Sequence, residues 1–63
     1  MTDFTLTGGG TIYLLRPITD AARDWVDQHI PDDAMWFGGQ VAIEHRYIDD
    51  IIDGITADGL EVS

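Results

Sequence analysis

The chain contains no cysteine and no lysine, and its single serine is the last of its 63 residues. Without cysteine, no disulfide and no thiolate metal site can stabilise the fold. Without lysine, cysteine or an internal serine, covalent catalysis has few candidates, and a chain this short has little room to enclose a substrate. We therefore predict a protein that is not an enzyme and has no catalytic residue and no cofactor.

Long hydrophobic runs are also missing. No segment approaches the roughly 18 consecutive apolar residues typical of a membrane-spanning helix. The opening residues, MTDFTLTGGG, lack the basic stretch that begins a signal peptide. A cytoplasmic protein is the expectation that follows.

Positive charge is scarce. Three arginines stand against twelve acidic residues, ten of them aspartate, which gives a formal net charge of −9. Such a chain repels nucleic acids and anionic membranes and is attracted to basic surfaces. We predict no direct contact with nucleic acid or membrane, and a partner that is a basic, nucleic-acid-binding protein or complex.

The first half of the chain predicts a strand followed by a helix. Residues 11–16, TIYLLR, are β-branched, aromatic or leucine and indicate a strand, here expected to be central and buried. Thr19 is a good N-cap, and apolar residues recur at helical spacing as far as residue 30. Pro31 ends this helix, and PDDA at residues 31–34 is typical of a turn.

The second half predicts a hairpin and a longer helix. Gly38 and Gly39 separate two strand-like runs, at residues 35–37 and 40–44. Residues 45–57 carry isoleucines at helical spacing and predict one helix whose Ile48, Ile51, Ile52 and Ile55 face the sheet. Residues 60–62 are expected to return as an edge strand.

This order predicts an α+β fold: a small antiparallel sheet with two helices on one face, in the ferredoxin-like βαββαβ order. Residues 1–10 are expected to form a flexible leader or a short strand, and residues 11–63 a single domain. An alternative uses residues 4–6 as an additional strand, paired across the glycines at positions 8–10.

Two motifs that often carry chemistry do not do so here. The run GGGTIY precedes a strand and opens no helix, so it lacks the helix N-terminus that binds phosphate. His29 and His45 have no histidine or cysteine at ligand spacing, and we predict no metal site. His29 lies on the apolar stripe of the first helix, where packing is its expected role.

The aspartates form two rows at helical spacing, which are Asp20, Asp24 and Asp27 in the first helix and Asp49, Asp50 and Asp53 in the second. Residues three or four apart on a helix have Cβ atoms about 5–6 Å apart, and like charges at that distance cost a few tenths of a kcal/mol per pair. This spacing resembles that of phosphates along a nucleic-acid strand. The rows therefore suggest a nucleic-acid mimic that occupies a basic groove.

Two alternatives remain open. Abundant aspartate without lysine also suits a proteome adapted to high salt or a GC-rich genome, in which case the acidic surface only solvates the protein. The MWFGG segment, with Trp36 and Phe37, is the second possible partner-binding surface, because strand alternation leaves one of its sides exposed and apolar. This favours a small homo-oligomeric structural or interaction protein.

The segments TIYLLRP, WFGG and HRYIDDIIDGITADGL, within residues 11–60, resemble a family of short acidic proteins of unassigned function from bacteria and their mobile elements. In size, acidity and lack of enzymatic motifs the chain is also similar to phage-encoded anti-CRISPR proteins, several of which imitate DNA and block a CRISPR surveillance complex. This second resemblance implies inhibition by competition for a DNA-binding groove.

Overall fold

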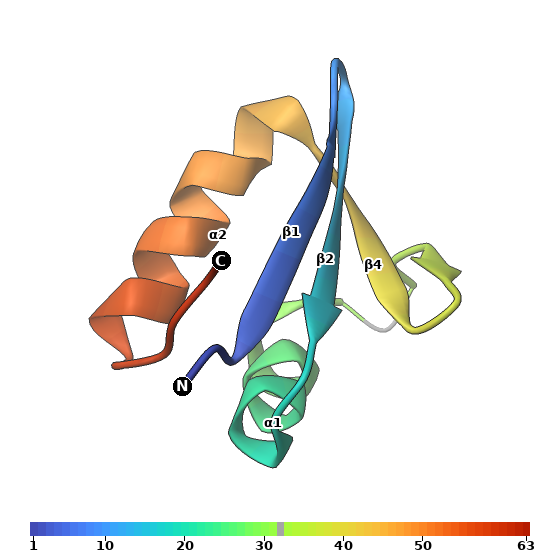
Figure 1. Cartoon of the computed structure of the whole chain (residues 1–63). Helices are drawn as coiled ribbons and strands as arrows, with labels where there is room; N and C mark the ends of the chain where they lie inside the picture. The colour runs from blue at the N-terminus through green and yellow to red at the C-terminus, as the bar shows by residue number, and fades with distance from the viewer. Residues whose placement is uncertain (32) are drawn as a thin grey trace.

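The computed structural model describes residues 1–31 and 33–63. It contains a four-stranded antiparallel sheet and two helices (Figure 1), so the predicted α+β class is confirmed. The elements in chain order are β1 (Phe4–Gly9), β2 (Ile12–Pro17), α1 (Asp20–His29), β3 (Trp36–Phe37), β4 (Gln40–Glu44) and α2 (His45–Ala57). The turn expected at residues 31–34 includes residue 32, which lies outside the described residues.

The prediction of a ferredoxin-like βαββαβ order is wrong. The chain begins with two consecutive strands, and the sheet order is β1-β2-β4-β3 with antiparallel neighbours throughout. The alternative, an additional strand paired across the glycines, describes this arrangement. The segment expected as an edge strand at residues 60–62 forms an isolated parallel bridge, between Val62 and Phe4, at the free edge of β1. Backbone hydrogen bonds from Phe4 to Glu61 and from Leu6 to Ser63 accompany it.

Glycine is the physical reason for the extra hairpin. β1 and β2 pair along their whole length, from Phe4 opposite Pro17 to Gly9 opposite Ile12. Gly10 lies in the turn with φ +68°, and Gly8 has φ +100°, a backbone region that other residues rarely adopt. A Cβ on Gly8 would also lie only 2.9 Å from the carbonyl oxygen of Ile12. The glycine run therefore builds a tight β-hairpin.

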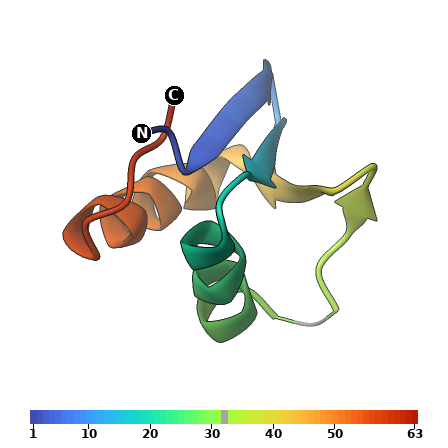
Figure 2. The same ribbon diagram turned by 60° about the horizontal axis from the view of Figure 1, so that its bottom comes forward.

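Both helices lie on the same side of the sheet (Figures 1 and 2). On the covered side, Phe4, Leu15 and Val41 are completely buried, and they pack with Trp25 and Val26 of α1 and with Ile48 and Ile55 of α2. The side chains between them on the strands point to the other side and remain at least partly exposed. β2 is therefore central, as expected, but only one of its faces is buried.

The helix boundaries follow the local sequence. The Thr19 hydroxyl accepts a hydrogen bond of 3.1 Å from the amide of Ala22, which confirms the predicted N-cap of α1. α2 spans His45–Ala57 as predicted. Its isoleucine stripe faces the sheet, with Ile48 and Ile55 buried and Ile51 and Ile52 half-buried.

Trp25 joins the two helices. Its ring lies edge-on to Phe4 in the core and covers Gly54 of α2, where an added Cβ would meet the indole at 3.2 Å. The indole nitrogen donates a 2.6 Å hydrogen bond to Asp58, just beyond the end of α2. Glycine at position 54 thus allows α2 to approach the Trp25 ring closely. No helix within the described part of the chain is long and apolar enough to cross a membrane.

Candidate functional site

All six aspartates of the two predicted rows are exposed. In α1, Asp20, Asp24 and Asp27 lie opposite the buried stripe that contains Ala22, Trp25 and Val26. In α2, the corresponding residues Asp49, Asp50 and Asp53 lie away from Ile48 and Ile55. Both helices cover the same side of the sheet (Figure 2). The two rows therefore belong to one layer formed by α1 and α2, which we call the helical layer.

Few cations lie near these carboxylates. Arg23 binds Asp20 one helical turn away, at 3.1 Å. Among residues 1–31 and 33–63, the other five aspartates of the rows take part in no ion pair. Arg46 instead binds Glu44 at 3.0 Å, and its guanidinium lies over the ring of Tyr47. The helical layer is therefore a surface of largely uncompensated negative charge.

The two rows do not form one continuous line. α1 and α2 run at a steep angle to each other, as Figure 2 shows. The rows consequently diverge across the helical layer and present their carboxylates over a broad area. Sequence periodicity predicts each row separately but contains no information about the angle between them.

The predicted aromatic residues, Trp36 and Phe37, belong to the β3–β4 hairpin and not to the helices that carry the acidic rows. Trp36 and Phe37 are 45% and 52% exposed, and Met35 just before them is 64% exposed. Because Trp36 pairs with buried Val41, it shares the covered side of the sheet, while Phe37 points to the opposite side. The structure therefore does not bring Trp36 and Phe37 together into one patch.

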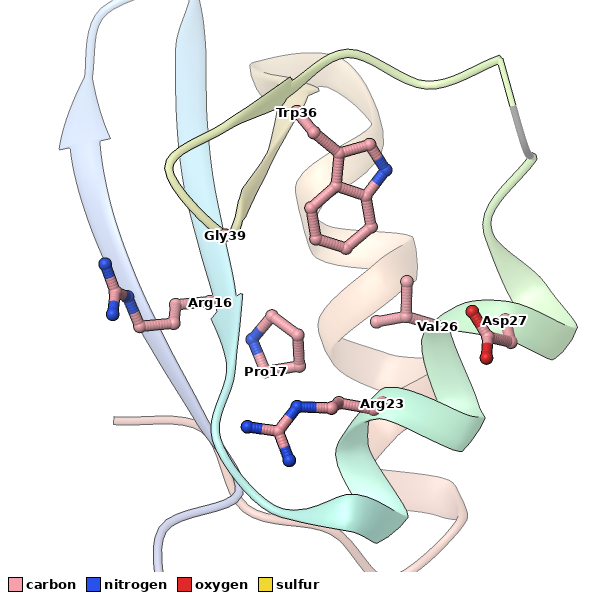
Figure 3. A pocket seen from close by; sticks show the side chains of 7 residues that line it. All are labelled: Arg16, Pro17, Arg23, Val26, Asp27, Trp36 and Gly39. Atoms are coloured by element: carbon pink, nitrogen blue, oxygen red, sulfur yellow. The ribbon is translucent and has the colours of Figure 1, made fainter.

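A hollow of about 380 Å³ lies between α1 and this hairpin (Figure 3). Pro17, Val26 and the Trp36 ring form its apolar walls, and Arg23 and Asp27 contribute charge from α1. Arg16 also borders the hollow, but its guanidinium points away from it and donates to the carbonyl of Gly38 at 3.3 Å. Asp27 thus places one predicted acidic residue beside Trp36.

His29 packs against Trp25, as expected from its place on the apolar stripe. The two rings are stacked with centroids 4.3 Å apart. One imidazole nitrogen lies 2.9 Å from the Trp25 carbonyl oxygen, and the other lies 3.7 Å from Asp58. This histidine–carboxylate pair borders an open hollow, but none of the residues described along that hollow has a hydroxyl or thiol. The arrangement packs α1 against the end of α2.

The chain termini meet at Asp3. Its carboxylate accepts a 2.7 Å hydrogen bond from the Thr19 hydroxyl and a 3.0 Å hydrogen bond from the Glu61 amide. These two donors, the Thr19 hydroxyl first, lower the pKa of Asp3 below its ordinary value. Asp3 thereby holds the N-cap of α1 and the C-terminal segment against β1.

Sequence reasoning missed two features. The sequence analysis assigned no role to Asp58, although its hydrogen bond to Trp25 spans 33 residues. The exposed side of β2 was also missed, because an unbroken apolar run resembles a strand buried on both faces. The available signal was Arg16, because a charged residue in such a run indicates that one side of the strand is exposed.

Among the residues that the structure describes, no three histidine or acidic side chains are grouped so that they could hold a metal ion. Comparisons with protein-family models, with curated proteins and with solved structures found no match to this chain. The resemblances noted from the sequence therefore stay predictions.

Proposed function

We propose that this protein is a non-enzymatic acidic binding protein, an anti-CRISPR-like nucleic-acid mimic that blocks a nucleic-acid-binding protein or complex. The observation that carries the proposal is the exposure of all six row aspartates, five of them without an ion pair in residues 1–31 and 33–63. A basic groove that has bound this surface has no room for nucleic acid.

Repulsion between the aspartates of each row favours a role in binding a partner over a role in stabilising the fold. Like charges three or four residues apart on a helix are destabilising by a few tenths of a kcal/mol per pair. The rows therefore weaken the isolated protein slightly, and a cationic partner removes that cost. Long-range attraction between a −9 chain and a basic groove also speeds their encounter.

The divergence of the rows narrows the kind of partner. Carboxylates spread over two helices at a steep angle match a wide basic surface, such as a duplex-binding groove, better than a narrow single-strand channel (Figure 2). Binding is then distributed over several contacts. Each exposed ion pair contributes roughly 0–1 kcal/mol.

The experiment is displacement of fluorescent duplex DNA from purified nucleic-acid-binding complexes of the host, a CRISPR surveillance complex among them. The test variant carries Asp49→Asn, Asp50→Asn and Asp53→Asn. The control carries Asp32→Asn, Asp33→Asn and Glu61→Gln, which removes the same charge outside the two rows. We expect the test variant to bind up to about 150-fold more weakly, since three pairs at about 1 kcal/mol each sum to slightly more than two factors of ten.

A single Asp→Asn should weaken binding by about fivefold at most. Affinity should also fall as salt rises, because screening weakens exposed charges. If the triple variant displaces DNA as well as the parent does, the mimic hypothesis fails.

A second candidate function is a small homo-oligomeric interaction protein with a solvating acidic surface. The exposed apolar side chains of the β3–β4 hairpin, Met35 and Phe37, favour it. In that case the charge keeps the protein dispersed, and neither triple variant changes any binding activity.

A further inference from the structure

The side of the sheet away from the helices has a regular arrangement that the strand register defines. We call it the outer face. Its residues form three rows across the strands: Glu44, Ile12 and Gly9; then Met35, Ala42, Leu14 and Thr7; then Phe37, Gln40, Arg16 and Thr5. A 3.5 Å contact between the Thr7 hydroxyl and the Gln40 amide oxygen, on strands that are not neighbours, fits this placement.

Charge is distributed differently on the outer face and on the helical layer. The three rows contain one acid, Glu44, and one base, Arg16. These two residues lie in the first and third rows, at opposite ends of the face. The outer face is therefore neutral in a chain whose net charge is −9.

The centre of the outer face is apolar. Leu14 lies directly opposite Ala42, and the Ala42 amide binds the carbonyl of Met35 at 2.9 Å. Ile12 and Met35 are 43% and 64% exposed. No helix covers this side of the sheet (Figures 1 and 2).

We infer that the outer face binds a second copy of this chain, face to face, with the strands of the two copies antiparallel. The twofold axis lies between the sheets and crosses the strands near Leu14 and Ala42. In a twofold interface, each contact between two different positions occurs twice. This inference concerns a surface separate from the aspartate rows and does not depend on the proposed function.

Charge complementarity selects a second copy and fixes its orientation. The antiparallel arrangement places each Arg16 over the second copy's Ile12, next to the second copy's Glu44. Each Glu44, which Arg46 of its own chain already binds at 3.0 Å, then also meets the Arg16 of the other copy. These two contacts lie on either side of a centre made of Leu14, Ala42 and Met35. The parallel arrangement would place the two Arg16 side chains beside each other, and like charges in contact disfavour it.

The size of the face sets the expected strength. With strands about 4.8 Å apart and outward residues about 6.8 Å apart along each strand, four strands and three rows cover on the order of 400 Å² in projection. Stable complexes bury about 800 Å² per partner. We therefore expect a weak dimer whose population depends on protein concentration.

The test is sedimentation equilibrium of the whole chain from micromolar to millimolar concentration, with circular dichroism to verify folding. The parent should change from monomer to dimer over this range, and Leu14→Asp should stay monomeric. Arg16→Glu alone and Glu44→Arg alone should each raise the dissociation constant by about tenfold or more, because each creates a like-charge contact. The double variant, which combines Arg16→Glu with Glu44→Arg, should have a dissociation constant within about threefold of that of the parent.

Two variants in the helical layer match these charge changes. Arg23→Glu and Asp49→Arg alter the net charge equally and should leave dimerisation within about twofold of the parent. A parent that stays monomeric at millimolar concentration would overturn the inference and leave the face to a different protein. A dimer that survives Leu14→Asp, or a double variant that does not recover, would also overturn it.

The dependence of binding on salt concentration distinguishes this inference from the proposed function. Raising ionic strength from 0.01 to 0.15 M shortens the Debye length from about 30 to about 8 Å. This screens the repulsion between two −9 chains, so the dimer should not weaken as a complex with a basic partner would. Leu14→Asp should leave DNA displacement unchanged, so either proposal can fail alone.

Discussion

The indole nitrogen of Trp25 donates a 2.6 Å hydrogen bond to the carboxylate of Asp58. The bond connects the middle of α1 to the residue that follows α2, and the stacked ring of His29 lies beside it. Since Trp25 also covers Gly54, one side chain fixes both the separation and the relative position of the two helices. The relative position of the two aspartate rows on the helical layer therefore depends on this contact.

Asp58→Ala should lower the free energy of unfolding by about 1–2 kcal/mol, because it removes a hydrogen bond to a partly exposed charged group. Asp58→Asn keeps an oxygen acceptor for the indole and should cost less than half as much. Urea titration followed by far-ultraviolet circular dichroism measures both values. Equal losses in the two variants would mean that the hydrogen bond is not the source of the stability.

Asp3 should make folding stability depend on pH. Its pKa is lowered in the folded state by the Thr19 hydroxyl and the Glu61 amide. Its stabilising contribution is therefore fully present above the unfolded pKa, about 3.9, and is lost as pH falls from there through the lower folded pKa. Urea titrations at several pH values should show that Asp3→Asn is less stable than the parent at neutral pH and that this difference shrinks in acid. A difference that stays constant with pH would contradict this role.

The isoleucines of α2 should not be equivalent. Ile55 is completely buried, so Ile55→Ala should cost about 2–5 kcal/mol and can unfold a chain this small. Ile51 is only half-buried, and Ile51→Ala should cost clearly less than Ile55→Ala. Thermal and urea denaturation of both variants checks this order. Equal costs would show that the stripe packs differently.

Local sequence was sufficient for the features that depend on near neighbours. The N-cap at Thr19 and the limits of α2 involve residues three or four positions apart, and the sequence displays those spacings directly. The Gly38-Gly39 pair of the β3–β4 turn and the aspartate spacing within each helix belong to the same class. The exposure of the six aspartates also follows from periodicity, since a helix that buries one stripe exposes the opposite one.

Tertiary structure decided what depends on segments that are far apart in the chain. The sequence left open whether residues 4–9 join the sheet, because strand pairing is a choice among distant partners with similar local signals. Pairing β1 with β2 replaced the ferredoxin-like order and made the outer face. The angle between the aspartate rows, the bond from Trp25 to Asp58 and the placement of Arg16 and Glu44 at opposite ends of one face likewise exist only once the elements have packed. Periodicity thus fixed which side chains face outward on each helix, and the packing of the sheet and helices fixed which of them share a surface.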